Sequence, residues 1–306
     1  MPKISVVVVS YNHQHYILDC LRSIAAQNYP SLEVIFVDDG STDNSTEIAR
    51  SFSEIDLQVF SKQNGGPSDA INYGLERASG DICVLTSADD ILLPGSLEER
   101  AHLLDHSEAD IVCGLAQWIG ADGEKLKPSD HPDLFPPFQM SSVDLFRKLY
   151  LKGNFICAPS IAMHSTTFKE IGEFDRDFFQ LQDYDYWMRA TCLGKTFHCI
   201  DSPVVGYRWH DKNLSTSNTD RAEIETTQVL EQVIGAASSD FLSEVLFGSD
   251  HAYFALELTQ NELGALLMMK HTNQKVSIKG KDRIAEYLSS SARYDAFKQS
   301  ILMYKN

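Results

Sequence analysis

Two adjacent carboxylates, Asp89 and Asp90, follow a short apolar run at residues 82–85. Short apolar runs bounded by turn signals are typical of buried parallel strands. In open α/β sheets, ligands bind just beyond the carboxyl ends of such strands. Two acids at this place therefore predict a site for a hard divalent cation, which would in turn hold a diphosphate. The alternative is structural: Asp90 caps a helix and Asp89 forms a turn.

Three further apolar runs also end in polar residues. The runs are residues 4–9, 34–37 and 57–60, and the polar segments after them are Ser10-Tyr11-Asn12, Asp38-Asp39-Gly40 and residues 61–66. Helical patterns lie between the runs, at residues 17–27, 45–52 and 68–78. Strands that alternate with helices at this spacing predict right-handed crossovers and one parallel sheet. Acids, glycines and other polar groups should therefore gather on one rim of that sheet.

The 306 residues are enough to bury a large core, and their formal net charge is −17. Nucleic acid is excluded as the main partner, because phosphate backbones require Lys and Arg. The charge is uneven, however, since residues 270–306 hold eight Lys or Arg against three acids. A basic tail on an acidic body predicts contact with an anionic membrane surface or a partner protein, unless it is simply a solvated helix surface.

The six cysteines include no Cys-x-x-Cys pair, and most lie inside apolar runs where Cys behaves as a small hydrophobe. A reducing compartment fits this pattern best. The first twelve residues lack the layout of a signal peptide, and no apolar stretch approaches the roughly 20 residues of a spanning helix. We expect a cytoplasmic protein, either soluble or peripheral at the inner face of the membrane.

Four motifs follow one another in a recognisable order. They read Val-Ser-Tyr-Asn at 9–12, Val-Asp-Asp-Gly-Ser-Thr-Asp at 37–43, Asn-Gly-Gly-Pro at 64–67 and Ser-Ala-Asp-Asp-Ile-Leu-Leu-Pro-Gly at 87–95. Together with an acid motif at residues 174–187, they resemble the family 2 glycosyltransferases of GT-A fold. The resemblance covers about residues 3–212. It implies an α/β fold with a mostly parallel, nucleotide-binding sheet flanked by helices. It also implies inverting transfer of a sugar from a nucleotide-diphosphate donor, usually a UDP-sugar, with Mn²⁺ or Mg²⁺.

The same resemblance gives roles to residues at the strand ends. Asp39 matches the acid that accepts the uracil N3–H, and the ring of Tyr11 could lie against the base. Asp38 is expected to hold its loop by hydrogen bonds. The alternative for both acids is a turn that caps the next helix. The other expected donor-binding residues are Ser10, Asn12, Asn64, Gly65, Ser87, Ala88 and Arg208.

Asp89 matches the metal-binding last acid of the family's Asp-x-Asp motif, but Ser87 stands where the first acid is usual. A hydroxyl adds no charge to hold a cation, so this departure implies weaker metal binding or a different donor. His210 resembles a histidine that the family often places to close on the metal or the pyrophosphate. Neutral imidazole is a reasonable Mn²⁺ ligand, although a histidine after a strand is often only structural.

Asp183 matches the aspartate of the family's acid pair and is the expected general base, which takes the proton of the acceptor hydroxyl. Gln182 replaces the usual Glu and removes a like charge that could raise the pKa of its neighbour. Asp183 is therefore expected to be more acidic than is usual there. Trp187 lies four residues further on, on the same helix face, as a core residue or an acceptor platform.

The expected organisation is a glycosyltransferase domain at 1–218, with a donor half at about 1–97 and an acceptor half at about 98–218. A helical extension at 219–306 follows, with helical patterns at 223–237, 241–247, 252–271 and 281–303. The third pattern is amphipathic and predicts packing on the core, a homodimer contact or docking on lipid. The implied acceptor is a saccharide or a lipid-linked saccharide, in surface polysaccharide or glycan assembly.

Two alternatives stay open. One is a catalytically weakened nucleotide-sugar-binding protein, suggested by Ser87, Gln182 and by Ile71, which stands where the family commonly has Arg. The other is a nucleotidyltransferase or dinucleotide enzyme on a related sheet. Against the second, no Gly-x-Gly-x-x-Gly or P-loop follows the first strand.

Overall fold

The computed structural model describes residues 1–132, 134–216, 218–248 and 258–288. The contacts between residues group the chain into two compact units. The first unit comprises Met1–Met140, Phe155–Tyr186 and Lys195–Thr219, and the second comprises Ser141–Asn154, Trp187–Gly194 and residue 220 onward. The predicted domain limits of 1–218 and 219–306 stay a prediction.

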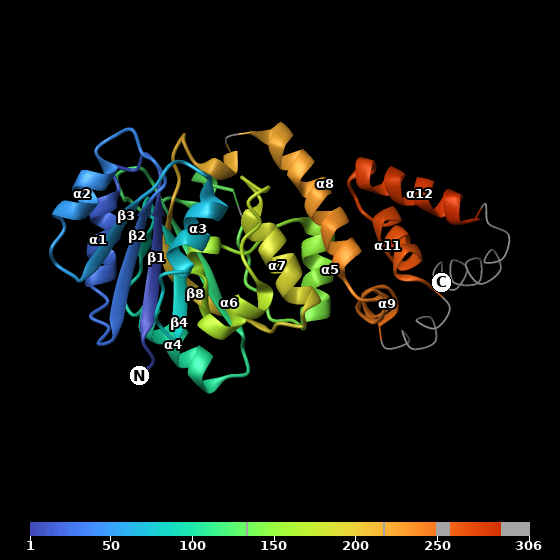
Figure 1. The fold of residues 1–306 in the computed structure, drawn as a ribbon, viewed down its shortest axis with the longest axis horizontal. Coiled ribbons are helices and arrows are strands. Elements are labelled where there is room, and N and C mark those ends of the chain that lie inside the picture. Colours follow the sequence, from blue (N-terminus) through green and yellow to red (C-terminus); the bar gives the residue numbers. More distant parts are fainter. Residues whose placement is uncertain (133, 217, 249–257, 289–306) are drawn as a thin grey trace. The chain divides into compact units, whose positions relative to one another are not determined.

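The first unit contains an eight-stranded sheet with the order β3-β2-β1-β4-β7-β6-β8-β5. Figure 1 shows β3, β2, β1 and β4 side by side in this order. The strands are β1 (Ile4–Ser10), β2 (Leu32–Asp38), β3 (Leu57–Ser61), β4 (Ile82–Ser87), β5 (Ile91–Leu92), β6 (Ile111–Ile119), β7 (Ala162–His164) and β8 (Phe197–Arg208). Strands β3, β2, β1 and β4 are parallel to one another, and β6 is parallel to β8. Strands β7 and β5 pair antiparallel with their neighbours. The predicted mostly parallel sheet is confirmed, although the whole sheet is mixed.

Helices cover both faces of the parallel strands, which explains why these strands are continuously apolar. The helices of this unit are α1 (Ile17–Ala25), α2 (Ser45–Ser51), α3 (Pro67–Leu75), α4 (Ser96–His106), α6 (Ser165–Ile171) and the start of α7 (Gln182–Cys192). Residues of α1, α2 and α4 pack with Val6, Val34 and Val84 in one core cluster. On the opposite face, Ala70 of α3 packs with Ile35 and Val37 of β2.

The carboxylate of Glu33 lies near the amino end of β2. It connects this strand to the amino ends of β1 and β4. It accepts hydrogen bonds from Ser5 Oγ at 2.5 Å, Ser79 N at 2.7 Å and Lys3 Nζ at 2.9 Å. Burial alone would raise the pKa of Glu33, but these hydrogen bonds outweigh it and lower the pKa from 4.5 to about 2. The ionised carboxylate therefore stabilises the folded state.

The variant Glu33→Gln is expected to lower the free energy of unfolding at pH 7 by about 1–2 kcal/mol, because the site is partly solvated. The folded pKa lies below the unfolded one, so the contribution is present above the unfolded pKa and is lost as pH falls from 4.5 towards about 2. Urea unfolding of both proteins between pH 7 and pH 3 measures the difference. A difference that stays constant with pH would contradict the assignment, and Glu98→Gln, at an exposed glutamate, is the control.

The second unit is helical. Its helices are α5 (Ser142–Lys152), α8 (Thr219–Ala236), α9 (Ser239–Phe247), α11 (Gln260–Met269) and α12 (Gln274–Leu288). Lys275 and Lys279 of α12 form ion pairs with Glu223 and Glu231 of α8, at 2.9 Å and 2.6 Å. These pairs fix α12 along α8.

Two predicted helices differ in the structure. The helix predicted at 252–271 is not continuous, because Leu258 and Thr259 are not helical and α11 begins at Gln260, where the side chain of Thr259 accepts a bond from Glu262 N while the Glu262 carboxylate binds Thr259 N. Helix α12 begins at Gln274, before the predicted start at residue 281. The rest of these predictions, at residues 252–257 and 289–303, lies outside the described residues. Within the described ranges, no helix has the length and apolarity needed to cross a membrane.

Candidate active site

The carboxyl ends of β1, β2 and β4 bring the predicted site segments together. Ser10 at the end of β1 pairs in register with Asp38 of β2, and Val9 pairs with Ser87 of β4. The chain continues this pairing beyond the strands, because Asp39 N donates to Ser10 O at 2.8 Å and Ala88 N donates to Val9 O at 2.9 Å. The rim predicted from the sequence therefore exists as a continuous line of polar residues.

Asp39 is buried and connects this rim to the turn before α3. Its Oδ1 accepts from Gly65 N at 3.0 Å, and its Oδ2 accepts from Gly66 N at 2.8 Å. The turn favours glycine at position 66, where φ is +88°. One carboxylate oxygen has about two acceptor sites, so Oδ2 can take one further donor.

Lys62 is a site residue that the sequence analysis missed. Its Nζ lies 2.7 Å from Asp39 Oδ1 and 2.5 Å from Asp69 Oδ2. Burial alone would lower the pKa of Lys62, but its hydrogen bonds and charge interactions with the two carboxylates outweigh burial and raise the pKa. Lys62 is therefore charged and fixes Asp39. Only its place in the polar segment after β3 could have indicated this role.

The loop after β2 is held from two sides. Asn12 has φ of +58°, its Oδ1 accepts from Thr42 N at 2.8 Å, and its own N–H donates to Ser41 Oγ at 2.8 Å. Asp38 Oδ2 accepts from Ser41 N at 3.1 Å, which is the loop-holding role expected for Asp38. These contacts occupy Asn12 Oδ1, so any donor contact of Asn12 would have to use its side-chain NH₂ group.

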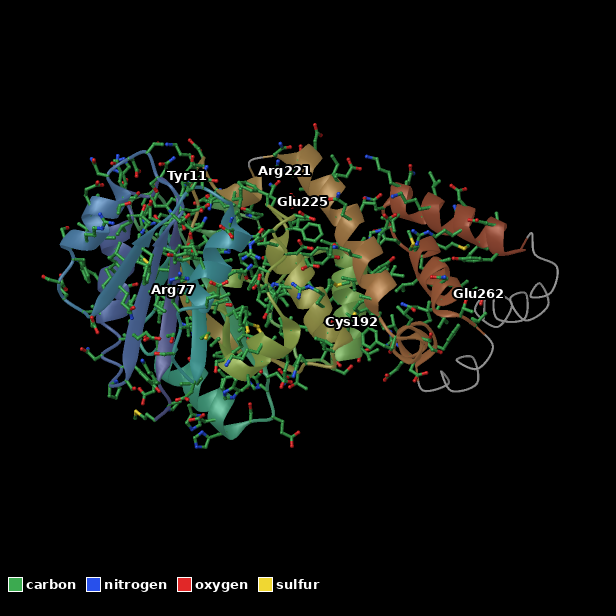
Figure 2. All side chains as sticks on the ribbon, in the orientation of Figure 1. Tyr11, Arg77, Cys192, Arg221, Glu225 and Glu262 are labelled. Atoms are coloured by element: carbon green, nitrogen blue, oxygen red, sulfur yellow. The ribbon has the colours of Figure 1, made fainter. Side chains whose placement is uncertain are left out.

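Tyr11 and Ser10, at the end of β1, have groups that a bound nucleotide could contact. The ring of Tyr11 is 46% exposed just beyond the strand (Figure 2). The hydroxyl of Ser10 is buried and has no hydrogen-bond partner. Asn64 and Gly65 are also exposed, in the turn that Asp39 holds.

Asp89 lies at the end of β4 and is 7% exposed. Its Oδ2 is 3.1 Å from His210 Nε2 and 3.7 Å from His13 Nε2, whereas its Oδ1 is buried without a hydrogen-bond partner. Burial would raise the pKa of Asp89, but the nearby imidazoles and the hydrogen-bonding groups of His210 and Ser87 hold it well below its usual range. Asp89 is therefore an anion with one free, buried oxygen.

Asp90 faces β8. Its Oδ1 accepts from Arg208 N at 2.8 Å. Burial, together with the charge of Asp89, raises the pKa of Asp90 well above its usual range. The Asp90 carboxyl group is bound to the backbone of β8, so it does not compensate for the serine at position 87.

Arg208 is 1% exposed, and its guanidinium is bound to protein groups. It donates to the carbonyl oxygens of Asp89 at 2.7 Å and Ala121 at 2.8 Å, and lies 3.3 Å from Asp19 Oδ2. The structure thus gives Arg208 a positioning role at the backbone of Asp89. The predicted contact with a donor stays a prediction that this geometry does not favour.

The hydrogen bonds of His210 identify its tautomer. Its Nδ1 accepts from Lys212 N at 3.1 Å, so a neutral ring carries its proton on Nε2, which donates to Asp89 Oδ2. The ring also stacks on Tyr16, with centroids 5.1 Å apart. A protonated nitrogen cannot bind a metal ion. In this loop conformation His210 is therefore a hydrogen-bond donor, and the predicted ligand role would require the Lys212 bond to break.

The residues at this rim fit a divalent cation that also binds a diphosphate. In the described part of the chain, no three His, Cys, Asp or Glu side chains group closely enough to hold a metal ion. The free Oδ1 of Asp89 is a hard anionic ligand of the kind that Mn²⁺ and Mg²⁺ prefer. A cation with few protein ligands takes the others from substrate phosphates and water.

Asp183 is the second residue of α7, and its Oδ1 accepts from Tyr184 N at 2.8 Å. Burial and then the charges of Asp90 and Asp183 raise the pKa of the Cys157 thiol, so both carboxylates act on the same buried side chain. The neighbouring Gln182 Oε1 is buried without a hydrogen-bond partner. Trp187 is fully buried, so the interpretation of Trp187 as a core residue is confirmed.

The segment that leads to Asp183 is fastened to α3. Asn72 Nδ2 donates to Phe174 O at 2.8 Å, and Asn72 Oδ1 accepts from Phe174 N at 2.9 Å. Ser68 Oγ donates to Phe178 O at 3.0 Å, and Arg176 Nε lies 2.8 Å from Asp69 Oδ1. One helix therefore positions both the Asp39 turn and the segment before Asp183.

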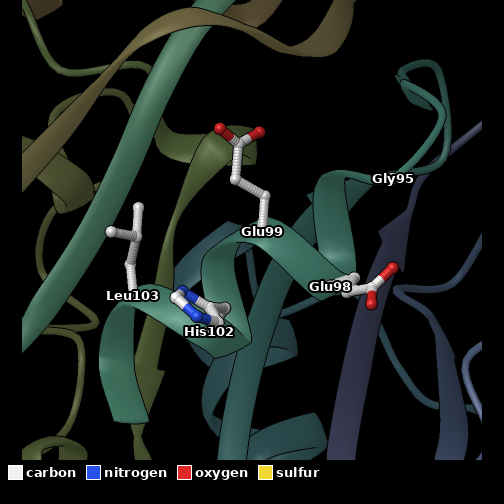
Figure 3. Close-up of a pocket in the computed structure, with 5 residues that line it drawn as sticks. All are labelled: Gly95, Glu98, Glu99, His102 and Leu103. Atoms are coloured by element: carbon white, nitrogen blue, oxygen red, sulfur yellow. The ribbon is translucent and has the colours of Figure 1, made fainter. Parts of the chain in front are cut away.

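A separate pocket lies along α4, lined by Gly95, Glu98, Glu99, His102 and Leu103 (Figure 3). None of the predicted site residues lines it. The two glutamates are exposed. This pocket therefore does not belong to the strand-end rim.

Comparison with known proteins identifies the class of this fold and site. Residues 5–172 match the model of glycosyl transferase family 2, which is more than half of the chain. The chain therefore belongs to glycosyltransferase family 2. It is 28% identical over 239 residues to an uncharacterized glycosyltransferase of Rickettsia typhi, covering 75% of this chain and 70% of that protein. It is also 39% identical over 114 residues to glycosyltransferase GlyG of Streptococcus pneumoniae, covering 36% and 38%.

Among the related proteins, the similar region spans about a third of the glycosyltransferases of Rickettsia felis and Rickettsia conorii, at 35% and 34% of their lengths. Two solved structures share the fold. TarS of S. aureus in complex with UDP-GlcNAc aligns with a TM-score of 0.63 and 18% identity, covering 99% of this chain and 91% of that one. The mannosyltransferase PcManGT of Pyrobaculum calidifontis, in complex with GDP-Man and Mn²⁺, aligns with a TM-score of 0.60 and 18% identity, covering 99% and 85%. The expected GT-A fold is confirmed.

Proposed function

We propose that this protein transfers a sugar with inversion from a UDP-sugar to an acceptor hydroxyl, with Mn²⁺ or Mg²⁺. The observation that carries the proposal is the free, buried Oδ1 of the ionised Asp89, on the same strand-end rim as Asp39. Support also comes from two proteins of the same fold. TarS was solved in complex with UDP-GlcNAc, and PcManGT was solved in complex with GDP-Man and Mn²⁺.

In this proposal, Asp39 Oδ2 accepts the uracil N3–H, and the exposed ring of Tyr11 lies against the base. Ser10, Asn12, Asn64, Gly65, Ser87 and Ala88 surround the nucleotide. Asp89 holds the cation, which, when bound, would neutralise charge on the diphosphate. His210 Nε2 donates a hydrogen bond at the same place, and Arg208 keeps the backbone of Asp89 in position.

Asp183 is the proposed general base. The acceptor oxygen attacks the anomeric carbon from the face opposite the diphosphate, and its proton passes to the Asp183 carboxylate. A new carbon–oxygen bond forms while the bond to the diphosphate breaks, and the diphosphate leaves with the electron pair. A single displacement of this kind inverts the anomeric configuration.

We further propose a cytoplasmic protein that acts on a saccharide or lipid-linked saccharide in surface polysaccharide or glycan assembly. The GT-A domain is placed at 1–218 and the helical extension at 219–306. Peripheral membrane contact or a homodimer through the extension stays part of this proposal. A second candidate is a nucleotide-sugar-binding protein without turnover, favoured by the uncharged Ser87 and the unpartnered Gln182 Oε1.

Calorimetric titration of UDP into metal-stripped protein, with and without Mn²⁺, tests the proposal. We expect binding that requires Mn²⁺, followed by release of UDP from UDP-sugars when acceptors are supplied. Binding without any turnover would favour the second candidate. Absence of UDP binding under both conditions would contradict the proposed donor.

The variant Asp39→Asn is expected to weaken UDP binding by about tenfold to a hundredfold, because it loses a charge-assisted hydrogen bond to uracil N3–H. Binding of CDP should not weaken, since cytosine N3 is an acceptor that the Asn amide can meet. Calorimetry with both nucleotides measures the ratio of affinities. The control is Asp69→Asn, which also removes a partner of Lys62 but should leave the UDP:CDP ratio unchanged. Equal losses for UDP and CDP in Asp39→Asn would contradict the role of Asp39.

A further inference from the structure

His13 lies beside Asp89 with neither ring nitrogen in a hydrogen bond. Its Nδ1 is buried and unpartnered, and its Nε2 lies 3.7 Å from Asp89 Oδ2. The backbone around the ring is firmly held, because His13 N donates to Ser45 Oγ at 3.0 Å and His13 O accepts from Tyr16 N at 2.9 Å. We propose that His13 is the nitrogen ligand of the divalent cation, together with Asp89, and that His210 is not a ligand.

The tautomers of the two histidines support this assignment. His210 uses Nδ1 to accept from Lys212 N, so its Nε2 carries a proton and cannot bind a cation. No bond constrains His13 in this way, so it can carry its proton on Nδ1 and present the lone pair of Nε2 towards Asp89. The His13 side chain is partly exposed, and its buried Nδ1 has no hydrogen-bond partner, so no contact fixes its tautomer.

The separation of His13 Nε2 and Asp89 Oδ2 is also compatible with two ligands of one cation. At 3.7 Å the pair is too far apart for a hydrogen bond. Two ligand atoms that each lie about 2.1 Å from one ion are separated by about 3.0 Å at a right angle and about 4.2 Å when opposite. The 3.7 Å between His13 Nε2 and Asp89 Oδ2 lies within this range, and the unpartnered Oδ1 of the same carboxylate is the oxygen that would complete the contact, since Oδ2 already accepts from His210. A nitrogen ligand beside a carboxylate should favour Mn²⁺ over Mg²⁺, which prefers oxygen.

This inference rests on the proposed function, because diphosphate oxygens and water must complete the coordination sphere. Pulsed electron paramagnetic resonance of Mn²⁺ with UDP detects nitrogen hyperfine coupling from a directly bound imidazole. The proteins to compare are the wild type, His13→Gln, His210→Gln and the control His15→Gln, which changes an exposed histidine two residues away. Calorimetry of Mn²⁺ in the presence of UDP gives the affinities of the same proteins.

We expect nitrogen coupling in the wild type, His15→Gln and His210→Gln, and none in His13→Gln. Loss of the ligand should weaken Mn²⁺ binding by at least about tenfold. Coupling that survives in His13→Gln, or that disappears in His210→Gln, would overturn the inference while leaving the proposed function intact. If His13→Gln does not fold, the His210→Gln protein still decides whether His210 is the source. A wild type that binds no UDP with Mn²⁺ would overturn the inference and the proposed function together.

Discussion

The variant Asp183→Asn is expected to lower the rate of sugar transfer by about 10²–10⁴-fold, which is the usual contribution of a general base. Asn has nearly the same shape but cannot take the proton of the acceptor hydroxyl. Binding of UDP with Mn²⁺ should be unchanged, because the Asp39 turn and Asp89 do not include this side chain. Steady-state turnover and calorimetry on the same preparation separate the two effects.

The matched control for this experiment is Asp177→Asn. Asp177 is an exposed acid in the segment that leads to α7, so its replacement removes the same charge without touching the reacting groups. It should retain turnover close to that of the wild type. Full activity in Asp183→Asn would exclude Asp183 as the base, and equal losses in both variants would indicate a general effect of charge on the segment.

The variant Asp89→Asn should remove the Mn²⁺ dependence of UDP binding. Even residues that only support a metal ligand change affinity by about 10–100-fold, so loss of the ligand itself should reach at least the upper end of that range. Asn keeps the volume of the side chain and an acceptor for His210, whose Nε2 lies 3.1 Å from Asp89 Oδ2. Calorimetric titration of UDP with and without Mn²⁺ measures the effect.

Its matched control is the neighbouring Asp90→Asn. Asn at this position keeps the shape of the side chain and can still accept from Arg208 N, and Asp90 is directed at β8. We expect Mn²⁺-dependent UDP binding to survive in Asp90→Asn. Retention of that dependence in Asp89→Asn would show that the cation binds elsewhere.

The parallel half of the sheet could be predicted from the sequence because each strand is buried on both faces and reads as an unbroken apolar run. The strand-end acids followed from that pattern, since carboxyl ends of parallel strands share an edge. The start of α11 within the predicted helix at 252–271 was missed, although Thr259 and Glu262 form a capping signal in the sequence. The apolar pattern at 252–271 predicts one continuous helix, whereas the capping residues Thr259 and Glu262 begin a new one.

The site residues that the sequence did not reveal depend on contacts between distant segments. His13 meets Asp89 across 76 positions, and Lys62 meets Asp39 across 23. Arg208 has the residue type of a phosphate ligand, but its guanidinium is directed into protein carbonyl groups. Residue type and spacing indicate which chemistry is available, whereas the direction of a side chain depends on the packed tertiary structure.

Helix α3 has a practical consequence for redesign of this protein. Its Asp69 contacts Lys62, the partner of Asp39, and also Arg176 in the segment before Asp183, while its Asn72 binds the backbone of Phe174. A substitution that shifts α3 should therefore change the donor KM and the turnover number together. Libraries that aim to alter the acceptor alone should leave α3 unchanged and vary loops that it does not anchor.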